Sequence, residues 1–258
     1  MSANDKKEEK KGCHRDIEDL VLCDKVKRNL EKKVGAQPGQ AAAAVLHPPR
    51  ALSLVRRGAG IGGSDISWAH PLTLTALYTL LNDNQDLATK MVVGNTSAGI
   101  WPDAGQVQLY IDIRDIKDLN TVVVSSSGVT FGAATPFTKF IQFLNSQIAT
   151  VGKKARNFEA VLPHVKRIAS HQIRNVGCIA GNLMLTYNHA DFPSDFMCVS
   201  ATIGATVTYQ DALSQGSAPV TVPVENLYKV DMQNKVILNI YWPYAKDNEY
   251  IGRHYDYY

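Results

Sequence analysis

Residues 91–100 constrain the fold of this chain more than any other segment. Residues 90–93, typical of a short buried strand, end in an apolar run over residues 91–93, which breaks abruptly into small and polar residues between Gly94 and Gly99. In such a loop the backbone N–H groups can converge on one point and form an anion-binding nest. The side chains of residues 95–97 add further donors. The segment therefore predicts either a phosphate- or pyrophosphate-binding loop at the end of a strand, or an ordinary strand-to-loop turn.

A second segment, residues 171–183, has the same character. It is rich in small residues, it carries Arg174 and Asn175, and it follows a predicted helix. Two donor loops of this kind could approach one extended, charged ligand from two sides. Their joint presence favours the ligand-binding interpretation of both.

Composition excludes several classes of protein. The chain has 258 residues, 45% of them hydrophobic, which is enough for one large or two small lobes. Its net charge is +3 and its lysines and arginines are scattered, so we expect no nucleic-acid partner. We expect no membrane segment, because no apolar run reaches the ~18 residues that a spanning helix needs. The lysine-rich start resembles no secretory signal, and a cytoplasmic location is therefore expected.

The four cysteines predict reduced thiols in that compartment. Cys13, Cys23, Cys178 and Cys198 have spacings that fit neither C-x-x-C nor an iron–sulfur pattern. We therefore expect no iron–sulfur cluster in this chain. The sequence also shows no metal-ligand cluster and no nucleophile triad, so no side chain is predicted to be catalytic.

Hydrophobic periodicity predicts an α+β protein with helices and strands mixed along the chain. Thr73 or Thr75 would cap the first helix, and Pro163 would kink the last helix or mark its true start. A hairpin is expected across residues 122–131. The other predicted elements are helices over residues 72–81, 136–148 and 158–168, and strands over residues 91–93, 107–113, 205–209, 220–222 and 236–242.

Residues 1–62 are predicted to be a disordered or linker tail, because they combine charged runs, an alanine run and Pro48-Pro49. Residues 58–63 satisfy the pattern G-x-G-x-x-G, which could be a dinucleotide fingerprint. That fingerprint must open a helix within a strand–helix–strand unit. Since only a few residues separate it from Pro71, we favour a flexible linker.

Five stretches, in order along the chain, resemble the flavoprotein domain of the xanthine dehydrogenase and aldehyde oxidase family of molybdenum hydroxylases. Residues 91–100 resemble its flavin loop, L-V-V-G-N-T-x-x-G-I, and residues 172–182 its Q-I-R-N-V-A-S-x-G-G-N segment. Residues 68–71 are similar to the W-x-x-P entry of the domain, residues 192–195 to a variant of its S-D-L/F segment, and residues 236–244 to its closing strand.

The resemblance implies a two-lobed FAD-binding fold of the PCMH type. A small βαβ lobe over about residues 63–118 would precede a lobe with an antiparallel sheet and helices over about 119–250. Residues 251–258 would be a truncated C-terminal end, in which Tyr255 stands where many relatives carry a lysine near the flavin.

The resemblance also implies which residues bind FAD. The first loop would wrap the pyrophosphate, Ile168 would lie against the flavin ring, and Cys178 would lie near the phosphates, where a thiol is a weaker donor than the usual hydroxyl. Asp195 would touch the sugar-alcohol chain, or else belong with Ser194 to a helix N-cap. The full set is Val92, Val93, Gly94, Asn95, Thr96, Ser97, Ala98, Gly99, Ile168, Cys178, Gly181, Asn182, Asp195 and Ile237.

The function implied is that of an electron-transfer flavoprotein module, which passes electrons from iron–sulfur clusters to NAD or oxygen. Its partners would be iron–sulfur and molybdenum-cofactor domains or subunits. One alternative is a truncated, non-catalytic remnant that keeps the fold without binding FAD. Another is a free-standing flavin oxidase. Many such oxidases attach FAD through a histidine or cysteine in a flavin loop, and the first loop contains neither.

Overall fold

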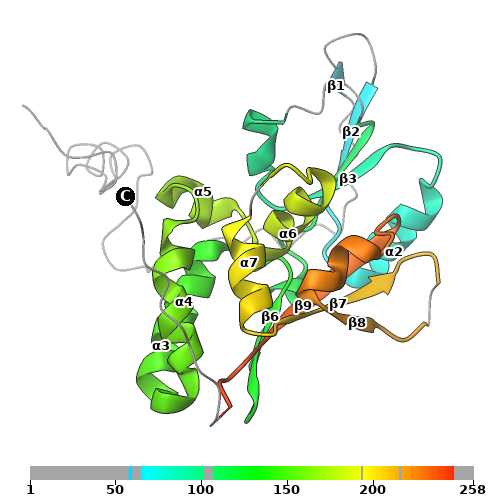
Figure 1. Ribbon diagram of the computed structural model, residues 1–258. Helices are drawn as coiled ribbons and strands as arrows, with labels where there is room; N and C mark the ends of the chain where they lie inside the picture. The colour runs from blue at the N-terminus through cyan, green and yellow to red at the C-terminus, as the bar shows by residue number, and fades with distance from the viewer. Residues whose placement is uncertain (1–57, 60–64, 102–106, 193, 215–216, 247–258) are drawn as a thin grey trace, which may run out of the picture. The chain divides into compact units, whose positions relative to one another are not determined.

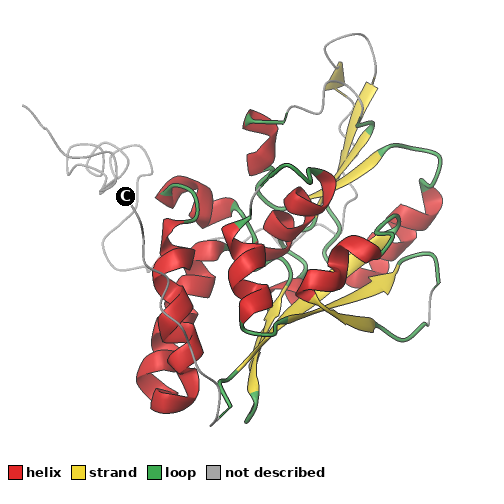
Figure 2. Cartoon of the chain, in the orientation of Figure 1, coloured by secondary structure: helices red, strands yellow, loops and turns green. Residues whose placement is uncertain are grey.

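The computed structural model describes residues 58–59, 65–101, 107–192, 194–214 and 217–246, all within one compact unit spanning Pro49–Tyr258. Two sheets carry the fold, and helices lie beside each of them (Figures 1 and 2). The smaller sheet has four strands and the larger has five. The predicted α+β class is confirmed.

The smaller sheet is built around a βαβ unit. Its strand order is β1 (Gly58–Ala59), β2 (Asp65–Ala69), β4 (Leu109–Asp112) and β3 (Thr89–Val92). β2 and β3 both run parallel to β4, and α2 (Leu74–Asp83) connects β2 to β3. Thr73 is the N-cap of α2, since its hydroxyl accepts a hydrogen bond from the Ala76 N–H at 3.1 Å. The parallel strands place the loops that follow β2, β3 and β4 at one edge of the sheet.

The larger sheet is antiparallel throughout. Its order is β5 (Val122–Val124), β6 (Gly128–Gly132), β9 (Lys235–Pro243), β7 (Thr206–Asp211) and β8 (Val220–Pro223). β5 and β6 form the hairpin that the sequence predicts.

Helices pack against the larger sheet through aromatic side chains. Phe140 of α3 contacts Trp242 of β9 and Phe131 of β6, with ring centroids 4.7 and 4.6 Å apart. Phe196 of α7 contacts the same tryptophan. All four rings are fully buried, so they form the centre of this lobe. The helices are α3 (Phe137–Val151), α4 (Arg156–Arg167), α5 (His171–Val176), α6 (Ile179–Asn188) and α7 (Asp195–Thr202), and short 3-10 helices cover Thr96–Gly99, Lys117–Asn120, Gly152–Ala155 and Val224–Lys229.

Two predictions about chain breaks are wrong in part. Of the two alternatives for Pro163, the start of the helix is wrong, because α4 begins at Arg156 and continues through the proline. Buried residues on both sides of it, among them Phe158 and Val165, hold the helix against the core. Gly58 and Ala59 are part of the predicted linker, yet they form strand β1, which pairs with β2.

The prediction of a donor loop over residues 171–183 is also wrong. This segment is helix α5, a junction at Gly177 and Cys178, and the first half of α6 (Figure 1). Ser170 and Cys178 are the N-caps of the two helices. The abundance of small residues therefore reflects a tight turn between two helices.

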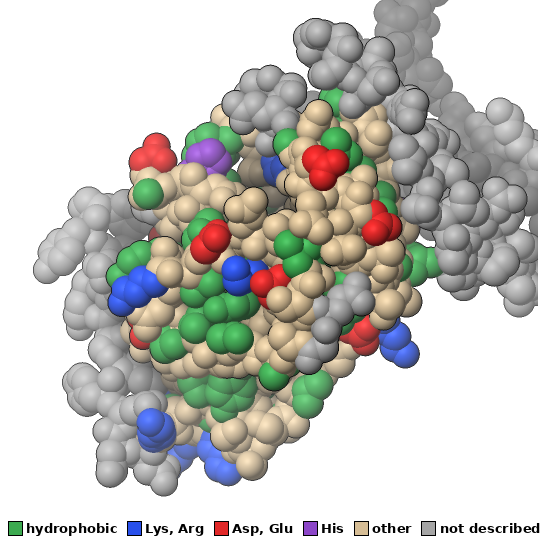
Figure 3. Space-filling view, turned by 90° about the vertical axis from the view of Figure 1, so that its right-hand side faces the viewer, with side chains coloured by type: hydrophobic (Ala, Val, Ile, Leu, Met, Phe, Trp, Pro, Cys, Tyr) green, Lys and Arg blue, Asp and Glu red, His purple; other side chains and the backbone are tan. Residues whose placement is uncertain are grey.

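The rest of the predicted tail and the C-terminal segment 251–258 lie outside the described residues, as do Cys13 and Cys23. Across the described part of the chain, no helix combines the length and apolarity needed to cross a membrane. One face shows a contiguous hydrophobic area, with basic and acidic side chains interspersed around it (Figure 3).

Candidate functional site

A pocket of about 610 Å³ contains most of the predicted site residues. Its walls come from the loop after β3, from α6 with the junction before it, and from the start of β9. The volume lies within the ~300–1,000 Å³ typical of sites for organic ligands. The predicted residues that line it are Val92, Val93, Gly94, Asn95, Thr96, Ser97, Ile168, Cys178, Gly181, Asn182 and Ile237.

Three predicted site residues do not line this pocket. Ala98 and Gly99 lie farther along the same loop. Asp195 is exposed at the first position of α7, next to the N-cap Ser194. The Ser194 hydroxyl donates to Asn182 Oδ1 at 2.6 Å, so it is Ser194 that connects α7 to a pocket residue.

The β3 loop, residues 93–101, carries hydrogen-bonding groups that have no partner among the described residues. Asn95 is left-handed, with φ of 47°, and residues Thr96–Gly99 then form a 3-10 turn. The N–H groups of Asn95, Thr96 and Ser97 have no acceptor among the described residues. The Oδ1 atom of Asn95 is buried and likewise unpartnered there. Buried polar groups are rarely left unpaired, so this arrangement suits a polar ligand.

Gly94 is required by packing between the two predicted binding segments. A Cβ atom at this position would lie 2.4 Å from the carbonyl oxygen of Val176, at the end of α5. A Cβ on Gly177 would likewise lie 3.4 Å from the Thr96 hydroxyl. The structure thus brings the two segments together, as the sequence predicts, but they meet as packed backbone.

The polar residues of α5 serve the fold. The Arg174 guanidinium donates to the carbonyl oxygens of Lys166, Ile168 and Ala169, and so caps the end of α4. Asn175 Oδ1 accepts a hydrogen bond from the Thr138 hydroxyl of α3 at 2.6 Å. Neither side chain lines the pocket.

The first N–H groups of α6 are also used within the protein. Ile179 and Ala180 donate to the carbonyl oxygens of Thr135 and Ala133, and Gly181 donates to the Cys178 sulfur at 3.2 Å. Burial raises the pKa of the Cys178 thiol from 9.0 to about 11, although hydrogen bonds from backbone N–H groups partly oppose this. Cys178 is therefore a neutral helix cap in the pocket wall.

The charge of the pocket wall favours an anion. Lys90 of β3 and Lys235 of β9 line it, and no aspartate or glutamate does so among the described residues. Trp101 and His189 also line it. The sequence analysis missed all four. Trp101 directly follows the predicted loop, and that position is the one signal that could have found it.

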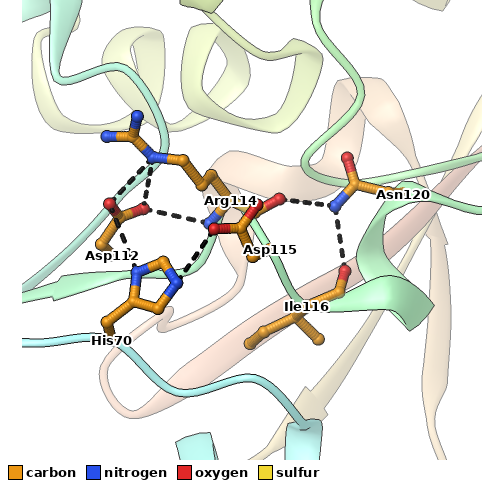
Figure 4. Close-up of polar contacts among 6 residues, drawn as sticks. All are labelled: His70, Asp112, Arg114, Asp115, Ile116 and Asn120. Atoms are coloured by element: carbon orange, nitrogen blue, oxygen red, sulfur yellow. Dashed lines mark hydrogen bonds and ion pairs between the residues drawn. The ribbon is translucent and has the colours of Figure 1, made fainter. Parts of the chain in front are cut away.

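A cluster of ionisable side chains lies at the same edge of the smaller sheet (Figure 4). His70, after β2, lies 3.6 Å from Asp112 and 3.0 Å from Asp115 through its two ring nitrogens. Arg114 Nε lies 2.8 Å from an oxygen of Asp112. The cluster joins the ends of β2 and β4, next to the strand from which the β3 loop departs, and none of its members lines the pocket.

The comparison that decides the family covers most of this fold. The family described as "FAD binding domain in molybdopterin dehydrogenase" matches residues 61–245. This chain belongs to that family. FAD is the cofactor that such domains bind in molybdenum hydroxylases.

Individual relatives agree with this assignment. "Probable aldehyde oxidase 4" of Oryza sativa subsp. japonica is 32% identical over 162 residues, covering 61% of this chain and 19% of the relative. "Probable aldehyde oxidase 1" of the same organism is 29% identical over 208 residues, covering 78% of this chain and 15% of the relative. The chain thus spans less than a fifth of the length of these curated relatives.

A solved structure shows the same fold. The carbon monoxide dehydrogenase from Hydrogenophaga pseudoflava that lacks the Mo-pyranopterin moiety matches with a TM-score of 0.53 and 20% identity. The match covers 70% of this chain and 60% of that chain. The two-lobed architecture expected of a molybdenum hydroxylase FAD domain is therefore confirmed.

The residues of the pocket fit FAD. The unpaired N–H groups of the β3 loop and the hydroxyls of Thr96 and Ser97 are donors of the kind that a pyrophosphate needs. The buried Asn95 Oδ1 is an acceptor suited to a sugar hydroxyl. The two lysines of the wall complement the negative charge of the pyrophosphate.

Proposed function

We propose that this chain is the FAD-binding, electron-transferring part of a molybdenum hydroxylase of the xanthine dehydrogenase and aldehyde oxidase kind. Iron–sulfur and molybdenum-cofactor domains or subunits would be its partners, and NAD or oxygen would accept the electrons. The observation that carries the proposal is the β3 loop, whose three unpaired N–H groups belong to residues that line a pocket without carboxylates in its described wall. The oxidoreductase names of the aligned relatives support it.

The β3 loop would hold the pyrophosphate through the N–H groups of residues 95–97 and the hydroxyls of Thr96 and Ser97. Ile168 and Ile237 are buried apolar residues of the pocket wall, and they would pack against the flavin ring and exclude water from it. Bound FAD would supply the redox chemistry, whereas the protein supplies position and electrostatics. No side chain of this chain is assigned a role as acid or base.

The absorption spectrum of the purified full chain tests the proposal. The chain would be incubated with FAD, freed of excess by gel filtration and scanned in the visible range. We expect the wild type to retain a flavin band. The double variant Thr96→Ala/Ser97→Ala should bind FAD at least tenfold more weakly, because hydrogen bonds to charged groups contribute ~1.5–3 kcal/mol each. Thr202→Ala is the control, since its hydroxyl donates to the Cys198 carbonyl away from the pocket.

A folded, colourless protein would overturn the proposal and favour a domain that keeps the fold without binding FAD. Circular dichroism would establish that it is folded. If the band is retained, the loaded protein can be reduced chemically and mixed either with NAD or with oxygen. The acceptor that restores the oxidised band would be the one used by this chain.

A further inference from the structure

An aromatic contact lies at the pocket wall, at a position that the site described so far does not use. Trp101 stacks on His189, with ring centroids 4.7 Å apart and an interplanar angle of 24°. Phe192 meets the same tryptophan edge-on, with centroids 5.3 Å apart and an angle of 84°. These three residues are termed the aromatic clamp. Trp101 and His189 both line the pocket, so their contact lies at its wall.

Each side of the clamp is fixed to an element that carries predicted site residues. The Trp101 N–H donates to the Ser97 carbonyl at 2.8 Å, which attaches the tryptophan to the β3 loop. The His189 N–H donates to Leu185 at 2.9 Å, so the histidine ends α6. The Phe192 N–H in turn donates to the His189 carbonyl. The backbone at Trp101 is therefore anchored on the β3 loop, and the backbone at His189 on α6.

The β3 loop and α6 meet at two places. At the start of the helix, Gly94 and Thr96 lie against the junction at Val176 and Gly177. At its other end, Trp101 lies against His189. The ten residues of α6 correspond to about 15 Å of helix. The two contacts thus lie at the two ends of the stretch of pocket wall that the β3 loop and α6 form.

We propose that the aromatic clamp holds the cofactor in the pocket and must open for the cofactor to leave, a role that rests on the function proposed above. A ligand bound between the β3 loop and α6 is enclosed by the backbone contact at one end and by the stacked rings at the other. The backbone contact is tightly packed, whereas stacked side chains can separate by rotation. Trp101 and His189 are therefore positioning residues that set the rate of cofactor release.

The release rate of radiolabelled FAD from the full chain, chased with excess unlabelled FAD, tests this role. Removing either stacked ring should speed release about tenfold, the upper range for the loss of one aromatic pair. Trp101→Ala and His189→Ala would be compared with the double variant. The double variant should release no faster than Trp101→Ala alone, because the contact between Trp101 and His189 is already lost in that variant. Trp101→Phe should retain part of the slow release.

Trp68→Ala is a matched control. Trp68 also stacks on an aromatic ring, that of Tyr110, with centroids 4.6 Å apart, but it does not line the pocket. Urea unfolding of the FAD-free variants separates lost stability from lost retention, and a clamp predicts faster release in the Trp101 and His189 variants alone. If Trp101→Ala does not fold, His189→Ala still tests the contact.

Release at the wild-type rate in the His189→Ala variant, or equally fast release in Trp68→Ala, would overturn the clamp while leaving the proposed function in place. A wild-type chain that retains no labelled FAD would overturn the proposed function, and the clamp with it. The two failures are thus distinguishable from one set of samples.

Discussion

The β3 loop and the α5–α6 segment have similar sequences but use their polar groups differently. Both are small, glycine-containing stretches with asparagine beside the glycines. In the β3 loop, three consecutive N–H groups are unpaired among the described residues. In the α5–α6 segment, the guanidinium of Arg174, the amide of Asn175 and the first N–H groups of α6 all bond within the protein. Small residues leave the backbone N–H groups accessible, but tertiary packing decides whether a protein group accepts their hydrogen bonds or leaves them for a ligand.

The largest expected effect sharpens this comparison at the point where the two segments touch. Gly94→Ala would place a Cβ 2.4 Å from the Val176 carbonyl oxygen, which is backbone and cannot rotate away. Overpacking of this kind costs ~1–3 kcal/mol, and we expect about 3 kcal/mol of unfolding free energy to be lost. Urea denaturation measures it. Gly99→Ala is the control, because its Cβ would meet no atom within 4 Å.

This expectation changes how a loss of FAD in a Gly94 variant is to be interpreted. The sequence alone indicates that the glycine admits the pyrophosphate, whereas the contact with Val176 gives it a packing role. If Gly94→Ala were as stable as Gly99→Ala and still failed to retain FAD, the pyrophosphate explanation would be the better one. If Gly94→Ala were much less stable than Gly99→Ala, the main role of the glycine would be to let the two segments pack together.

The second effect concerns Cys178, which lies in the pocket wall but caps a helix. Its pKa is about 11 in the folded protein against 9.0 as the ordinary value. Because the folded pKa is the higher one, this contribution to stability is complete below about pH 9 and is lost as the pH rises to about 11. At ~1.36 kcal/mol per pKa unit, the full loss is about 2.7 kcal/mol.

Urea denaturation at pH 7.5 and at pH 10.5 tests this contribution. The wild type should lose more stability over this interval than Cys178→Ser, which has no thiol to titrate. Cys198→Ser, at an exposed position, should keep the wild-type dependence. Equal pH dependence in all three proteins would show that the thiol is not shielded from solvent.

The sequence predicts local features of this fold better than it predicts the site. Thr73, one of the two predicted caps, is the N-cap of α2, and the turn between two short apolar runs over residues 122–131 correctly predicts the β5–β6 hairpin. These features depend on neighbouring residues. The stacking of Trp101 on His189 and the packing of Gly94 on Val176 depend on residues brought together from distant parts of the chain, and no local pattern encodes them. Pro163 does not start α4 for the same reason, because buried residues on both sides of it hold the helix against the core.

The smallest effect separates the roles of the two segments most directly. Arg174→Ala removes three hydrogen bonds from a charged donor to the end of α4, and we expect a loss of about 2 kcal/mol in unfolding free energy. FAD affinity should change little, since Arg174 does not line the pocket. The double variant Thr96→Ala/Ser97→Ala should instead lose FAD affinity and keep its unfolding free energy, because the two hydroxyls have no hydrogen-bond partner among the described residues.

Arg174→Lys should recover part of the stability, because it keeps a positive charge near the carbonyl end of the helix. Urea denaturation and FAD titration on the same samples would give the unfolding free energy and the FAD affinity of each variant. If Arg174→Ala lost FAD affinity at unchanged stability, α5 itself would contribute to ligand binding, as its sequence predicts.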